Sequence, residues 1–183
     1  MDSLEISPEI RRRRDHWVYR GETRPPFAHE PGPGQESVWD YPRPPRLEPD
    51  PRHIRVVFDN RLLAESRNSL RILETAGPPT FYLPRHDVLM DRLRRSETSL
   101  LCEWKGRSTG FDLVDGTREV AWSYLETFIE FEAIRGYFAF YPARVECFVD
   151  EERVVAQPGG YYGGWITREI VGPFKGDPTC EDL

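Results

Sequence analysis

Residues 54–64, Ile-Arg-Val-Val-Phe-Asp-Asn-Arg-Leu-Leu-Ala, decide the fold class of this chain. Two short runs rich in apolar residues flank Asp59-Asn60, a pair that favours the left-handed backbone of a two-residue hairpin turn. Strands joined by such a turn pair in antiparallel fashion. The segment therefore predicts a mainly β fold built from hairpins.

The rest of residues 54–150 repeats this organisation and indicates one β domain. Asp115-Gly116 gives a second hairpin signal. Strands do not alternate with helical segments long enough for a Rossmann-like sheet, which argues against a doubly wound fold. Short helices are expected at residues 86–94 and 130–135. We expect strands at residues 54–58, 61–64, 80–83, 99–103, 111–114, 118–122, 137–141 and 145–149.

Extended terminal arms flank this domain. Residues 1–53 contain ten of the 17 prolines, which exclude long helices and internal strands, so a short helix is expected only at residues 8–14. The same arm carries Trp39 and Tyr41, and we expect it to lie as a strap across the domain because a solvated linker would lack buried aromatics. Residues 151–183 form a Gly-rich extension that we expect to pack on the domain.

Composition and charge exclude several functions. The net charge is −6 and the arginines are interleaved with acids, so no nucleic acid partner is expected. The N-terminus resembles no signal peptide and no window of 18 apolar residues occurs, so we expect a cytoplasmic protein without a membrane partner. The three cysteines form no CxxC pair, and we expect neither a disulfide framework nor a bound metal. Without a P-loop or an Asp-x-Asp pair, we expect no cofactor.

Only two of the 25 lysine and arginine residues are lysine, and both follow an aromatic residue and precede glycine. Lysine carries a compact ammonium whose pKa burial can lower, which suits proton transfer or contact with one anion. We expect Lys175 to fold back toward a pocket that holds Lys105. Two ammonium groups there would lower each other's pKa and favour an anionic ligand.

An ordered set of segments within residues 54–150 resembles the bacterial domain-of-unknown-function 427 family, and residues 32–42 and 163–176 resemble its longer members. The segments are Leu73-Glu74-Thr75, residues 78–85, Cys102-Glu103-Trp104-Lys105-Gly106, Ala121-Trp122-Ser123-Tyr124 and Ala139-Phe140-Tyr141-Pro142.

The resemblance implies a compact, twisted antiparallel β domain akin to the β-tent group, with short helices. It implies no particular activity. The family is sometimes labelled nucleotidyltransferase-like, but the paired carboxylates and phosphate loop of that chemistry are missing from this sequence. Gly110 and Leu125 stand where the family usually has an aromatic residue and a proline, which changes the expected shape of one pocket wall.

Four residues are candidates for catalysis: Glu74, Tyr82, Cys102 and Lys105. A buried carboxylate acts as a general acid or base, and a thiol beside an ammonium becomes a nucleophile. On a strand, the side chains of Cys102 and Lys105 would point to opposite faces, so their contact requires a turn or bulge between them. The alternatives are a buried structural cysteine, and a lysine that pairs with Glu74 or Glu103.

Six further residues are candidates for ligand binding. An arginine clamps a carboxylate or phosphate, and aromatic rings line a cavity for a planar ligand. Ordinary core packing is the alternative for the rings. The six are Arg85, Trp104, Trp122, Tyr124, Tyr141 and Lys175.

Two functions are compatible with these residues. The first is an enzyme that uses acid-base or cysteine chemistry on a small, polar and anionic substrate. The second is a noncatalytic ligand-binding or protein-interaction module. A monomer and a homo-oligomer are equally compatible with the sequence.

Overall fold

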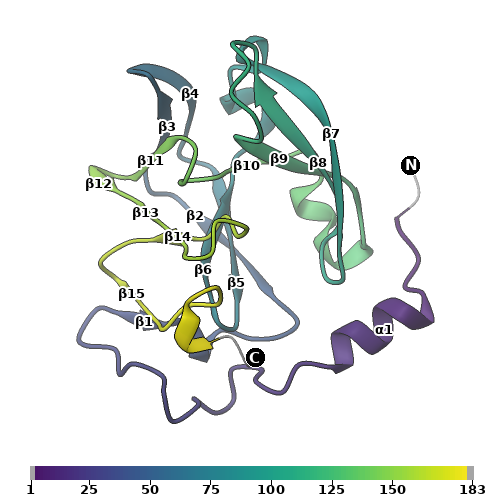
Figure 1. The fold of residues 1–183 in the computed structure, drawn as a ribbon, viewed down its shortest axis with the longest axis vertical. Coiled ribbons are helices and arrows are strands. Elements are labelled where there is room, and N and C mark those ends of the chain that lie inside the picture. The colour runs from purple at the N-terminus through teal and green to yellow at the C-terminus, as the bar shows by residue number, and fades with distance from the viewer. Residues whose placement is uncertain (1–2, 181–183) are drawn as a thin grey trace.

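A computed structural model describes residues 3–180, and it confirms a mainly β fold. The outer ends of the two arms, residues 1–2 and 181–183, lie outside the described residues. Within the described part of the chain, no helix is long and apolar enough to cross a membrane. Figure 1 shows the sheet that contains β7, β8 and β9 on one side of the molecule and strands β3, β4, β11 and β12 on the other.

Antiparallel pairing builds the three larger sheets. The first has the order β10 (Phe138–Phe140), β9 (Ala121–Thr127), β8 (Gly106–Leu113) and β7 (Leu93–Cys102). The second has the order β12 (Glu152–Arg153), β11 (Glu146–Val149), β3 (Ile54–Phe58) and β4 (Arg61–Ser66). The third has the order β2 (Arg46–Asp50), β5 (Ser69–Glu74) and β6 (Gly77–Tyr82).

Short elements complete the fold. Strand β1 (Glu36–Ser37) pairs in parallel with β15 (Ile170–Val171), and β13 (Val155–Ala156) pairs with β14 (Trp165–Ile166). The α-helix is α1 (Pro8–Asp15), as predicted, with Ser7 as its N-cap. The 3₁₀ turns are η1 (Val38–Asp40), η2 (Arg85–Asp87), η3 (Met90–Arg92), η4 (Ile129–Ile134) and η5 (Pro178–Cys180).

The hairpin predicted at residues 54–64 is confirmed. Asp59 and Asn60 have φ values of 49° and 57°, the left-handed conformation that a two-residue turn requires. The second hairpin also forms, between β8 and β9, but residues 118–120 belong to its connection and β9 begins at Ala121.

The helix predicted at residues 86–94 is wrong. Two 3₁₀ turns stand there, and strand β7 already begins at Leu93. Between the turns, Val88 is buried and forms a β-bridge with Ala64, and the Leu89 amide donates to the Leu63 carbonyl. This pairing with β4 replaces the hydrogen bonds of a helix. The helix expected at residues 130–135 is likewise a 3₁₀ segment, η4.

The strand expected at residues 80–83 is part of a longer strand, β6, in a three-stranded sheet whose other two strands were absent from the predicted set. Strand β2 forms despite Pro49, and β6 runs through Pro78 and Pro79. Strand β5 lies between β2 and β6 and pairs with both. Proline is compatible with these positions because β2 and β6 are the edge strands of their sheet.

The strap packs as expected. Trp39 is 1% exposed, and its indole Nε1 donates to the carbonyl of Pro173 at 3.0 Å. Trp39 and Tyr41 share an apolar cluster with Leu73 of β5 and with Ile170 near the C-terminus. The two arms therefore hold each other against the β domain, and Figure 1 shows them side by side at β1 and β15.

Candidate functional site

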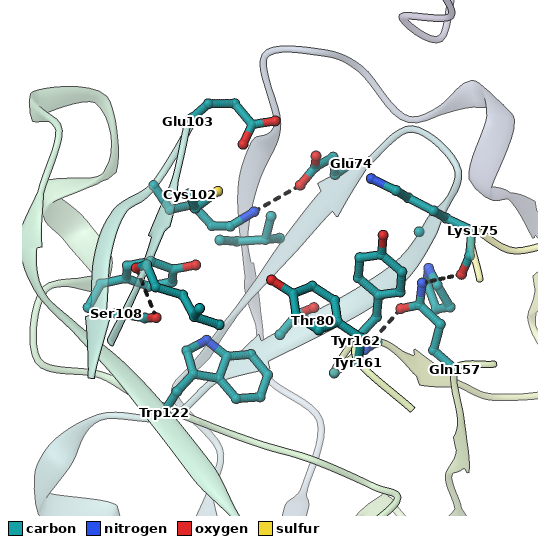
Figure 2. A pocket seen from close by; sticks show the side chains of 18 of the residues that line it. Glu74, Thr80, Cys102, Glu103, Ser108, Trp122, Gln157, Tyr161, Tyr162 and Lys175 are labelled. Carbon is teal, nitrogen blue, oxygen red and sulfur yellow. Dashed lines mark hydrogen bonds and ion pairs between the residues drawn. The ribbon is translucent and has the colours of Figure 1, made fainter. Parts of the chain in front are cut away.

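A cavity of about 400 Å³ opens between the β5–β6 hairpin, the β7–β8 hairpin and the two arms. Figure 2 shows Glu74, Cys102 and Lys175 along one side of it and Trp122 across from them. The lining includes Arg13, Trp17, Arg43, Glu74, Thr80, Tyr82, Cys102, Glu103, Lys105, Ser108, Trp122, Tyr124, Tyr141, Gln157, Tyr161, Tyr162, Gly163 and Lys175.

A tight turn brings Cys102 and Lys105 into the same cavity. The β7–β8 hairpin pairs Cys102 with Gly106 and leaves the three residues between them as the turn. Gly106 has φ of 123°, and a Cβ at this position would lie 2.3 Å from the carbonyl oxygen of Glu126. Glycine is therefore required directly after Lys105. The turn that brings Cys102 and Lys105 to the same side of the hairpin is therefore present.

Lys105 and Glu74 form an ion pair, as predicted. Lys105 Nζ lies 2.8 Å from Glu74 Oε2, and Arg43 Nε lies 3.6 Å from Oε1 of the same carboxylate. Burial alone would raise the pKa of Glu74, but Lys105 and Arg43 outweigh it and hold the pKa below its usual value. Burial alone would lower the pKa of Lys105, but Cys102 and Glu74 outweigh it and raise the pKa. Both groups are therefore charged at neutral pH.

Two buried tyrosines surround Cys102 and Lys105. Burial, with a smaller contribution from Cys102, raises the pKa of Tyr124 well above its usual value. Burial also raises the pKa of Tyr82, whose hydroxyl accepts a hydrogen bond from Trp122 Nε1 at 3.3 Å. Both phenols are neutral hydrogen-bonding groups at neutral pH.

Lys175 reaches this cavity from the C-terminal arm. Its amide donates to the carbonyl of Ala76, and its own carbonyl accepts a hydrogen bond from Gln157. Gly176 follows with φ of 93°, and a Cβ there would lie 2.4 Å from the carbonyl oxygen of Pro158. Both lysines lie between an aromatic residue and a glycine, and the structural reason for the glycine is the same at both sites. Each glycine adopts a positive φ beside another backbone segment.

The Lys175 ammonium lies against aromatic rings. Nζ is 4.2 Å from the centre of the Trp17 ring and 5.1 Å from that of Tyr162. Within residues 3–180 it forms no ion pair with a carboxylate. Burial is the largest cause that lowers the pKa of Lys175, and Glu74 opposes it. Lys105 also lowers the pKa of Lys175, as expected, whereas the pKa of Lys105 itself is raised by Cys102 and Glu74, so the prediction of a lowered pKa is wrong for Lys105.

The opposite wall is aromatic. The rings of Trp122 and Tyr141 lie 4.3 Å apart between centroids, and burial raises the pKa of Tyr141 to about 12. Gly163 packs directly against Trp122, since a Cβ on this glycine would lie 2.2 Å from the indole. This wall offers an apolar surface to a ligand.

Two predicted ligand-binding residues lie outside the cavity lining. Arg85 is exposed in η2, with its guanidinium 5.9 Å from the centre of the Phe138 ring. Trp104 is 2% exposed and packs against the guanidinium of Arg14 on α1. Gly110, expected to alter a pocket wall, faces Ser96 of β7 instead.

The arms also contribute lining residues that were not predicted from the sequence, among them Trp17, Arg43, Gln157 and Tyr162. Arg43 is the most telling, because its side chain is only 2% exposed and its guanidinium lies 3.6 Å from the centre of the Trp17 ring. A single arginine between prolines carries no periodic signal. The aromatic residues of the arms were the sequence feature that indicated contact between the arms and the domain.

The cavity carries more cations than anions. Four cationic side chains line it, Arg13, Arg43, Lys105 and Lys175, against the two carboxylates of Glu74 and Glu103. Arginine and lysine donate to anions and are poor metal ligands. The other cysteines lie elsewhere, Cys147 in the core beside β3 and Cys180 in the cluster with Trp39.

The fold and the cavity define a class of protein: a mainly β domain with a cation-rich cavity beneath its terminal arms. Residues 46–151 match the model of the family described as a domain of unknown function, DUF427, so the chain belongs to this family, as the sequence segments predicted. No curated protein matches the chain.

Proposed function

We propose that this chain is an enzyme that binds a small organic anion in the cavity and bonds covalently to it through Cys102. The observation that supports this function is the placement of a thiol, an ammonium and a carboxylate in one cavity, on Cys102, Lys105 and Glu74. The thiolate is the nucleophilic form of cysteine, and an adjacent ammonium stabilises it.

Acid-base catalysis by Glu74 and Lys105 is the weaker candidate. An efficient general acid or base has a pKa near the working pH. The ion pair moves the two pKa values away from neutrality in opposite directions. Lys105 instead supplies a fixed positive charge beside Cys102.

An acyl compound with a leaving group suits this arrangement. Sulfur of Cys102 attacks the carbonyl carbon, and the π electron pair moves to the oxygen, beside the Lys105 ammonium. Return of that pair expels the leaving group, which takes the proton released by the thiol, and a thioester remains. Water then supplies the oxygen and proton that release the acid and restore the thiol. We propose a cytoplasmic location, since thiols stay reduced there.

Alkylation by iodoacetamide at pH 7, followed by intact mass and peptide mapping, tests the nucleophile. We expect Cys102 to react faster than glutathione, and Lys105→Met to slow it at least about tenfold, because the substitution removes the positive charge that stabilises the attacking sulfur. Arg61→Met removes a positive charge at an exposed site and should leave the rate unchanged. Reaction no faster than glutathione, or a Lys105→Met rate equal to wild type, would refute the proposal.

A noncatalytic binding module is the second candidate. It is favoured by the polar groups that satisfy one another without a ligand, such as Glu74 with Lys105 and Trp122 with Tyr82. An unreactive Cys102 in a protein that still binds small anions would select this function.

A further inference from the structure

We infer that Lys175, with Trp17 and Tyr162, forms a seat for the carboxylate of the ligand, and that the ligand is an aromatic carboxylate whose ring lies against Trp122 and Tyr141. The inference rests on the proposed function, because it takes the same cavity as the binding site. It adds the class of ligand and assigns its recognition to the two arms.

One cation of the cavity lacks a carboxylate partner within the described residues. Lys105 and Arg43 share the carboxylate of Glu74, and Arg13 lies 3.4 Å from Glu103. Arg43 also donates to the carbonyls of Tyr19 and Thr75, whereas its buried Nε makes no hydrogen bond and keeps only the charge contact with Glu74. Lys175 alone among these cations has no carboxylate partner in residues 3–180.

The position of the Lys175 ammonium is fixed before any ligand arrives. Hydrogen bonds on both sides of the residue hold its backbone to Ala76 and Gln157. The rings of Trp17 and Tyr162 hold the ammonium on the cavity side, and Figure 2 shows it directed toward the region of Glu74. A cation held in this way needs little reorganisation to bind an anion, which favours affinity.

The aromatic wall formed by Trp122 and Tyr141 favours a ligand with an apolar, planar skeleton. Trp122 and Tyr141 present apolar ring surface, and hydroxyl groups of Thr80 and Tyr82 line the space between this wall and the cations. Ligand pockets span roughly 300–1,000 Å³, so a cavity of about 400 Å³ suits a ligand of one or two fused rings. A planar ring with one carboxylate fits a cavity that is apolar at one end and cationic at the other.

Binding of 2-naphthoate, measured by calorimetry on the full chain, tests the seat against the neutral isostere 2-naphthamide and against inorganic phosphate. We expect naphthoate to bind at least about tenfold more tightly than naphthamide, equal to about 1.4 kcal/mol. Lys175→Met should remove this preference and leave naphthamide binding unchanged. Trp122→Leu should weaken both aromatic probes by the same factor, and Arg61→Met should weaken neither.

Equal binding of naphthoate and naphthamide, or an unchanged preference in Lys175→Met, would overturn the seat. Phosphate binding as tight as that of naphthoate would overturn the aromatic half of the inference. Alkylation of Cys102 in the wild-type chain separates this inference from the proposed function, because it needs no ligand in the cavity. A reactive Cys102 without naphthoate preference refutes the seat alone, and an unreactive Cys102 with that preference refutes the nucleophile alone.

Discussion

Replacing Lys105 by methionine should destabilise the protein by about 2 kcal/mol. Removing one partner of a fully buried ion pair costs about 3–5 kcal/mol, because the other charge is left without compensation. The cost is smaller here for two reasons. The Glu74 side chain is 24% exposed to solvent, and Arg43 still lies 3.6 Å from its carboxylate.

Urea unfolding of a double-mutant cycle measures this cost. Glu74→Gln in the Lys105→Met background removes the uncompensated charge, so we expect the double variant to regain about 1 kcal/mol or more relative to Lys105→Met. For a chain of this size, about 2 kcal/mol corresponds to a fall in melting temperature of roughly 4–8 °C. Because domains are typically stable by about 5–15 kcal/mol, we expect the variant to remain folded at 25 °C, which keeps the alkylation experiment valid.

Additive effects of the two substitutions would refute the reasoning. Additivity within about 0.5 kcal/mol would mean that the two charges do not interact energetically, despite the distance of 2.8 Å. The contribution of Lys105 would then arise from the packing of its aliphatic stem alone.

Three further predictions concern stability. Trp39→Ala should lower the free energy of unfolding by about 3–5 kcal/mol in urea, because a fully buried indole is removed; a loss below about 1 kcal/mol would contradict its role in holding the strap. Burial raises the pKa of Asp50, but hydrogen bonds from Arg52 outweigh it and lower the pKa. This stabilisation is therefore present above the unfolded pKa of about 3.9 and is lost as the pH falls through the lower folded value, so Arg52→Met should flatten urea midpoints between pH 5 and 2. Gly106→Ala should cost at least about 2 kcal/mol more than Gly116→Ala, because both have positive φ but only Gly106 lies against backbone; equal urea midpoints would contradict this.

The sequence predicts those parts of the fold that local chemistry determines. Asp59-Asn60 encodes its turn, and helix α1 begins at Pro8 after a Ser N-cap. The helix prediction for residues 86–94 failed because their apolar spacing resembles that of a helix. The β-bridge between Val88 and Ala64 depends on a partner 24 positions earlier in the chain. Such long-range pairing overrides local preference.

The candidate site was partly predictable for a related reason. Lys105 and Glu74 are charged residues within apolar or aromatic segments, and such residues need a partner when they are buried. Their pairing follows from that need. Arg43 and Trp17 lie in a proline-rich arm without periodicity, so no sequence pattern shows which of its side chains turn inward.

The division of the cavity between the family domain and the arms bears on how its specificity arises. The family match at residues 46–151 contains Cys102, Lys105 and Glu74, whereas Trp17 and Lys175 lie outside it. The arms are held to each other by the pairing of β1 with β15 and by the indole of Trp39, so their contribution is fixed in position. A substitution in an arm can therefore alter which anion binds without disturbing the reactive groups, provided that this pairing is kept. Recognition and chemistry are then separable properties of one cavity, which is the reason that Lys175→Met and Lys105→Met should affect different measurements.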